Sequence, residues 1–116
     1  MNIEEIREYC LAKKAVTEGF PFDETTLVFK VMNKMFCLLS LDAIRVNLKN
    51  DPEKNIQLRA QYPAIIPGFH MNKEHWNTVN LNGTIPPGLI KELIDKSYTL
   101  IVESLPKKKQ EEFKNL

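Results

Sequence analysis

The chain has 116 residues, of which 43% are apolar and 27% are charged, and its formal net charge is +1. This composition excludes the low hydrophobicity and high charge of disordered chains, and the length suits one domain that buries about two-thirds of its unfolded surface. The near-zero net charge gives no global attraction to nucleic acid or anionic lipid, so such binding would need a local basic patch.

A first helix is predicted at the N-terminus. Asn2, with Glu5 three residues later, is typical of a capping box, and Ile6 and Cys10 then lie on one helical face. We expect this helix to end before Gly19.

Three strands are predicted next. Residues 26–32 alternate with a two-residue period, residues 35–41 form an apolar run typical of a central strand, and Val46 and Leu48 are the inward positions of a third strand. Its outward positions form a basic outer row: Arg45, Asn47 and Lys49. A turn at residues 33–34 completes a meander of three antiparallel strands.

A second helix is predicted from Asp51 and Pro52 to about Tyr62, because Asp caps free amides, Pro fits the first helical position, and Pro63 ends the run. Residues 68–71 and 76–81 then look like two short strands joined by a polar segment, with a turn at 82–83.

The last predicted helix begins near Pro87. Its stripe recurs at three- and four-residue steps: Ile90, Leu93, Ile94, Ser97, Ile101 and Leu105. After Pro106, residues 107–115 indicate a charged tail or a short successor helix with Phe113 as its aromatic anchor.

The predicted order is therefore α-β-β-β-α-β-β-α in a single domain over residues 1–116. We expect a two-layer α+β sandwich: a five-stranded antiparallel sheet with helices on one face and mixed polar residues on the other, where the sheet meets water.

The chemistry-bearing residues are sparse. The chain has no glycine-rich phosphate loop, no G-x-S-x-G elbow and no H-E-x-x-H pair, so we expect neither an enzyme nor a cofactor. His70 and His75 lack nearby cysteines or paired carboxylates, so no metal site is predicted. Cys10 and Cys37 form no C-x-x-C pair and favour buried, reduced thiols.

The cellular compartment is expected to be the cytoplasm. Residues 1–5 lack the features of a secretory signal, and no apolar run reaches the ~18 residues needed to span a bilayer. A membrane partner is therefore not expected.

Two segments carry a family resemblance: E-G-F-P-F-x-x-x-T-L-V-F-K-V-M-N-K-M-F at residues 18–36 and P-G-F-H-M-N-K-E-H-W-N-T-V at residues 67–79. Together they resemble the MmcQ/YjbR family, and V-N-L-K-N-D-P-E at 46–53 and L-I-D-K-S-Y at 93–98 are similar to it in the same order. Asn33 stands where family members often have glycine in the hairpin turn, and Asn tolerates positive φ better than most residues.

The resemblance implies a fold similar to that of type III secretion chaperones and of CyaY-like proteins. It also implies DNA binding through a "double-wing" surface. The candidate residues for that surface lie on the two predicted hairpins and the strand between them: Lys30, Lys34, Lys49, Lys73, His75 and Trp76. Lys54 and Arg59 on the second helix could extend it.

Each candidate has a second interpretation. The cations could line a phosphate backbone, or they could belong to an ordinary solvated surface. Trp76 could stack on a base, or its indole could pack on the core and support residues 67–71.

Three functional hypotheses follow. The first is weak, salt-dependent and largely sequence-independent DNA binding through the two basic hairpins. The second is a protein-interaction or chaperone-like module that uses the open sheet face or its edge, in a monomer or weak dimer. The third is an enzyme or metal carrier that acts through His70 and His75.

Overall fold

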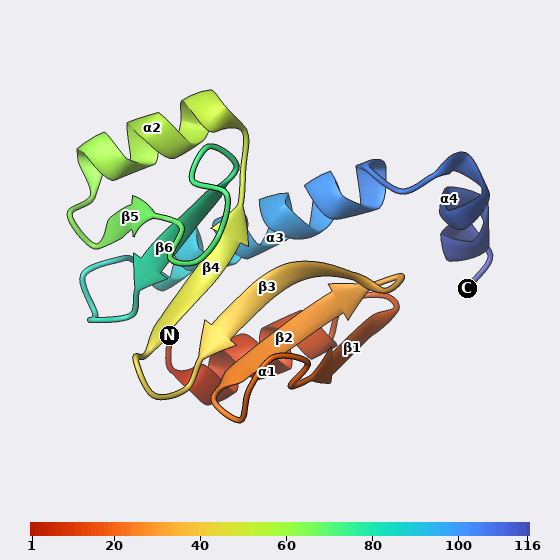
Figure 1. Cartoon of the computed structure of the whole chain (residues 1–116), viewed down its shortest axis with the longest axis horizontal. Coiled ribbons are helices and arrows are strands. Elements are labelled where there is room, and N and C mark those ends of the chain that lie inside the picture. Colours follow the sequence, from red (N-terminus) through yellow and green to blue (C-terminus); the bar gives the residue numbers. More distant parts are fainter.

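The computed structural model describes residues 1–116 as four helices and one six-stranded sheet (Figure 1). The elements in chain order are α1 (Ile3–Leu11), β1 (Val16–Gly19), β2 (Thr26–Val31), β3 (Lys34–Ser40), β4 (Arg45–Lys49), α2 (Pro52–Gln61), β5 (Ile65–Pro67), β6 (Trp76–Asn80), α3 (Pro87–Glu103) and α4 (Lys107–Lys114).

The strands pair in the order β1-β2-β3-β4-β6-β5, and every pair is antiparallel. The predicted meander is confirmed, with the apolar strand β3 between β2 and β4. A register shift between Phe29 and Lys30 marks a bulge in the β2–β3 pair. The α+β class and the antiparallel sheet are therefore as predicted.

Helices α1, α2 and α3 cover one face of the sheet, as expected, whereas α4 lies beyond the end of α3 (Figure 1). One buried cluster joins Phe29 and Leu39 of the sheet to Ile6 of α1, Leu58 of α2 and Ile94 of α3. This core follows from the predicted stripes, because burying apolar surface is the main favourable term in folding.

The predicted N-terminal capping is present at α1 but not at α2. The capping box is present at α1, where the Glu5 N–H donates to Asn2 Oδ1 at 2.8 Å and the Asn2 N–H donates to Glu5 Oε1 at 3.0 Å. At α2, Asp51 occupies the N-cap position without a side-chain cap bond, and Pro52 begins the helix.

The prediction of five strands was wrong, because β1 is a sixth. Its sequence, V-T-E-G, contains one large apolar residue, and its two central residues are exposed at the sheet edge. Such a short edge strand has no alternating pattern to detect. It is ordered by its pairing with β2, from Val16 opposite Val31 to Gly19 opposite Val28.

The strand predicted at residues 68–71 was also wrong, because that segment is a loop and the strand before it is β5. The ladder beside β6 ends when the Gly68 N–H donates to the Trp76 carbonyl at 2.9 Å. His70 then adopts φ of 58°, a left-handed conformation that cannot continue a strand. We call residues 68–75 the β5–β6 loop.

The face away from the helices, called the open face below, is less polar than predicted. Val28, Leu38 and Trp76 form a second buried cluster there, with Met35 and Met71 packed against it. Met71 comes from the β5–β6 loop, so part of this face is covered by chain rather than by water.

Two simpler observations complete the fold. Cys10 and Cys37 are free and buried, as predicted. None of the four helices combines the length and the apolar character that crossing a bilayer requires.

Candidate functional site

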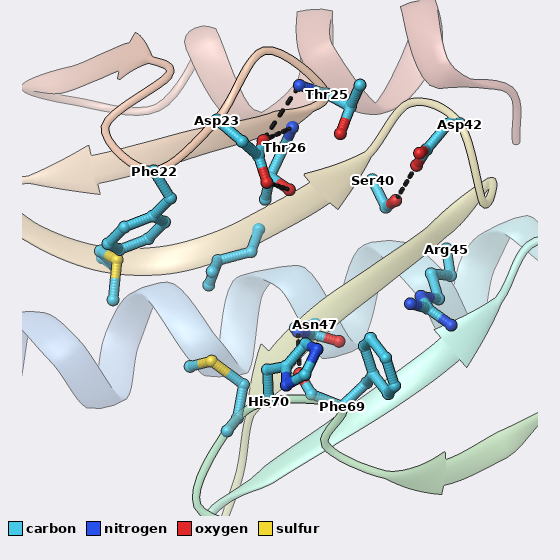
Figure 2. A pocket seen from close by; sticks show the side chains of 13 residues that line it. Phe22, Asp23, Thr25, Thr26, Ser40, Asp42, Arg45, Asn47, Phe69 and His70 are labelled. Carbon is cyan, nitrogen blue, oxygen red and sulfur yellow. Dashed lines mark hydrogen bonds between the residues drawn. The ribbon is translucent and has the colours of Figure 1, made fainter.

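The open face is hollowed over strands β2 to β4 (Figure 2). The hollow has a volume of about 560 Å³ and lies between the β1–β2 loop and the β5–β6 loop. Its lining residues are Phe22, Asp23, Thr25, Thr26, Met35, Leu38, Ser40, Asp42, Arg45, Asn47, Phe69, His70 and Met71.

The β1–β2 loop forms one wall and is held by Asp23. Asp23 Oδ1 accepts from the backbone N–H groups of Thr25 at 3.0 Å and Thr26 at 2.7 Å, and Oδ2 accepts from the Thr26 hydroxyl at 3.2 Å. The hydrogen bonds from Thr25 and then Thr26 lower the pKa of Asp23. This turn presents Phe22, which is 63% exposed.

The β5–β6 loop forms the facing wall and is held by a polar pair from the sheet. The Phe69 N–H donates to Thr78 Oγ1 at 2.8 Å, and Asn47 Nδ2 donates to the Phe69 carbonyl at 3.2 Å. The Thr78 hydroxyl donates to Asn47 Oδ1, which closes the network. Both backbone polar groups of Phe69 are therefore satisfied, while its ring is 44% exposed.

Arg45 and His70 both lie against the Phe69 ring. The Arg45 guanidinium carbon is 4.0 Å from the ring centroid, and the His70 and Phe69 centroids are 4.1 Å apart at an interplanar angle of 55°. Arg45 is half-buried, and its side chain makes no hydrogen bond or ion pair within the chain. Its guanidinium donors are therefore free for a ligand.

Charge is distributed asymmetrically between the two faces of the sheet. The cross-strand registers and the two-residue period place Lys30, Arg45 and Lys49 on the open face. No strand residue of that face is acidic, since Glu18 belongs to the helix-covered side and pairs with Arg7 at 2.5 Å. The strand residues of the open face therefore carry only positive charges, whereas the loops that border the hollow add Asp23 and Asp42.

The predicted hairpin lysines separate onto different faces. Lys30 lies on the open face opposite Met35, and Lys49 lies on the same face opposite Trp76. Lys34 instead reaches toward the end of α3, where its Nζ is 3.5 Å from Ser104 Oγ. The structure thus brings Lys30 and Lys49 onto one surface and leaves Lys34 off it.

The candidate residues predicted on the second hairpin make contacts that hold the β5–β6 loop in place. Lys73 Nζ donates to the Gly68 carbonyl at 2.8 Å, and the His75 carbonyl accepts from the Asn50 N–H at 3.0 Å. Trp76 is only 9% exposed, beneath Met71. This matches the interpretation in which the indole supports residues 67–71.

The two cations of the second helix also differ in their surroundings. Arg59 Nη1 donates to the Lys73 carbonyl at 3.0 Å, which fastens the β5–β6 loop to α2, whereas Lys54 is exposed. No group of three or more His, Cys, Asp or Glu side chains is arranged to hold a metal ion.

Sequence reasoning did not single out Phe22, Phe69 or Arg45 as site residues. Arg45 was visible in the basic outer row of the third strand. Phe22 and Phe69 each lie in a segment that carries the family resemblance, and Asp23 followed by Thr25 is a signal of a side-chain-capped turn. The sequence contains no signal that the β1–β2 loop and the β5–β6 loop face each other across the sheet.

Comparisons with known proteins agree with this fold and with the resemblance. The YjbR family model matches residues 11–100. The uncharacterized protein YjbR of Escherichia coli K12 is 36% identical over 112 residues, which cover 95% of each chain. The uncharacterized protein YbdF of Escherichia coli O157:H7 is 41% identical over 93 residues, 78% of this chain and 76% of YbdF.

Solved structures show the same fold. The crystal structure of a Deinococcus radiodurans protein with the family-model domain DUF419 has a TM-score of 0.91 at 39% identity, over 97% of this chain and 87% of that one. A Pseudomonas syringae protein has a TM-score of 0.75 at 32% identity, over 86% of this chain and 98% of that one. The chain therefore belongs to the YjbR family, as the motifs at residues 18–36 and 67–79 had indicated.

Proposed function

We propose that this YjbR-family protein is a non-enzymatic DNA-binding protein that contacts DNA with the open face of its sheet. The observation that carries the proposal is the charge of that face, where every charged strand residue is basic: Lys30, Arg45 and Lys49. This surface replaces the two basic hairpins as the site we favour, because Lys34 lies off the face and Lys73 bonds within its own loop.

The physical basis is counterion release. Cations that neutralise phosphates displace condensed counterions, so the affinity falls as salt rises, with a logarithmic slope of about −0.9 per phosphate contact for duplex DNA and about −0.7 for a single strand. Contacts from Lys30, Arg45 and Lys49 would give a slope of roughly −2 to −3. Binding of this kind is weak and largely independent of sequence.

The test is fluorescence anisotropy with labelled DNA at ~50 and ~200 mM salt. We expect binding that weakens with salt and that is lost in the triple variant Lys30→Gln, Arg45→Gln, Lys49→Gln. A matched triple variant, Lys91→Gln, Lys107→Gln, Lys108→Gln, makes the same charge change at exposed positions of α3 and α4 and should bind as the wild type does. Absence of binding, or equal losses in both variants, contradicts the proposal.

A protein partner is a second candidate, and the exposed apolar side chains favour it. Phe20, Phe22, Ile66 and Phe69 are between 38% and 63% exposed, and Phe22 and Phe69 border the hollow. Exposed large apolar side chains, aromatic ones above all, are typical of protein interfaces.

Sedimentation of the pure protein and co-purification from cell extract test this second function. Association with a partner or with a second copy supports this function if Phe22→Ser and Phe69→Ser abolish the association and Ile56→Ser does not. Ile56 is the matched control, since it is 61% exposed on α2, away from the hollow.

A further inference from the structure

We infer that the hollow on the open face is a subsite for one unstacked nucleotide of a single strand. The base would pack against the group formed by Arg45, Phe69 and His70, and a phosphate oxygen would accept from Arg45. This inference rests on the proposed function and adds to it the form of the nucleic acid that binds.

The size and the walls of the hollow suit a planar ring. Its volume of about 560 Å³ lies within the ~300–1,000 Å³ of pockets that enclose small ligands. Phe22 and Phe69 stand on facing loops (Figure 2). Met35 and Leu38 of β3 also line the hollow. Bases stack on aromatic rings and on guanidinium planes, and both kinds of group are already layered at Phe69.

The free guanidinium indicates that the ligand also carries an anion. Arg45 has no protein acceptor, whereas the acidic residues of the lining are engaged elsewhere. Asp23 accepts from its own turn, and Asp42 accepts from the Ser40 hydroxyl and from the Ala43 N–H, both at 2.8 Å. The hollow therefore suits a ligand that joins a flat ring to an anion, as a nucleotide does. The further cations on the open face suit the neighbouring phosphates of a strand.

The walls are held before any ligand binds. Asp23 fastens the turn behind Phe22, and Asn47 and Thr78 fasten the backbone of Phe69. Preorganised side chains lose less conformational entropy on binding. A base inside a duplex is stacked on both faces and cannot enter such a hollow, so the site predicts a preference for single strands.

The experiment measures anisotropy of the full chain with four probes: a single-stranded oligomer, its duplex, an abasic strand of equal length, and a mononucleotide as competitor. The abasic strand keeps the phosphates and removes every base. One stacked base should make the normal strand bind roughly 5- to 150-fold more tightly than the abasic strand. The mononucleotide should displace the normal strand.

The variants locate that advantage in the hollow. Phe69→Ala and Arg45→Lys should remove most of the preference for the normal strand over the abasic one. Phe20→Ala should preserve it, because Phe20 lies on the same β1–β2 loop and is 49% exposed but does not line the hollow. Unchanged melting temperatures confirm that the variants are folded.

The outcomes separate this inference from the proposed function. Equal affinity for normal and abasic strands, or tighter binding of the duplex, overturns the subsite and leaves DNA binding by the open face standing. Binding of none of the probes overturns both. If the mononucleotide binds but no strand does, the hollow binds a free nucleotide. The inference that it binds a nucleotide within a strand is then overturned.

Discussion

The guanidinium of Arg45 lies 4.0 Å from the centre of the Phe69 ring, so strand β4 and the β5–β6 loop meet through a cation and an aromatic face. Such contacts contribute about 0.5–1 kcal/mol at exposed sites. The contact also fixes where the unpaired charge of Arg45 sits, at the edge of the hollow on the open face. DNA binding by the open face, as proposed above, depends on this arrangement.

Asn47 is predicted to determine the position of the β5–β6 loop. Asn47→Ala leaves the Phe69 carbonyl and the Thr78 hydroxyl without their partner, which should lower the free energy of unfolding by about 1–3 kcal/mol in urea titrations. The control is Asn80→Ala, a half-buried neighbour on the same face without a side-chain hydrogen bond, expected to change it by less than ~0.5 kcal/mol. Equal losses in the two variants would contradict this role.

Gly68 is predicted to be required by close packing against Trp76. An added Cβ would lie 2.8 Å from the Trp76 Cβ and 2.9 Å from its carbonyl oxygen, so Gly68→Ala should cost about 1–3 kcal/mol and change Trp76 fluorescence. Gly88→Ala is the matched comparison, because its Cβ meets open space in the first turn of α3. There, higher helix propensity should increase stability by up to ~1 kcal/mol. A neutral Gly68→Ala would show that the loop is loosely held.

Lys30 and Lys34 are predicted to differ in their contribution to DNA binding, although they flank the same hairpin. Lys30→Gln should reduce the slope of log affinity against log salt by about 0.7 for a single strand, because one phosphate contact is removed. Lys34→Gln, on the helix-covered side near Ser104, should leave the slope unchanged. If the two substitutions reduce the slope equally, the hairpin as a whole binds DNA rather than the open face.

Tyr9 is predicted to make stability depend on alkaline pH. Burial, followed by its hydrogen bond to Asp95 at 2.7 Å, raises the pKa of Tyr9 to about 12, against about 10 in an unfolded chain. A raised pKa means that the folded state favours the neutral phenol. Its stabilising contribution is therefore complete below pH ~10 and is lost as the pH rises toward ~12.

Urea unfolding at pH values across that window tests this linkage. Tyr9→Phe should be less sensitive to pH than the wild type between about 10 and 12, because the titrating phenol is absent. Lysines also titrate in this range, so the difference between the two proteins is the informative quantity. Parallel pH dependences would show that Tyr9 contributes no linkage.

The sequence was most informative where one local rule decided the structure. The capping box at Asn2, the apolar run of β3 and the stripe through Ile94 each correspond to an element of the fold. β1 escaped detection because Thr17 and Glu18 are exposed on an edge strand, which is ordered by pairing rather than by its own pattern.

The site was less predictable because it is a product of tertiary structure. The alternation of the third strand placed Arg45 on the outer face, but no spacing reveals that Phe22 and Phe69 border one hollow. Trp76 was a candidate binding residue because an aromatic side chain among polar neighbours can either stack on a base or pack on the core. Its burial under Met71 was decided by a loop that the sequence had suggested was a strand.

The most direct test of the open-face account is an NMR titration of the isotope-labelled protein with a single-stranded oligomer. The account predicts that the largest amide shift changes fall at Phe22, Lys30, Arg45, Lys49 and Phe69, and that α2 and α4 change little. Shift changes concentrated on the lysine-rich α4, or no changes at low salt, would contradict it.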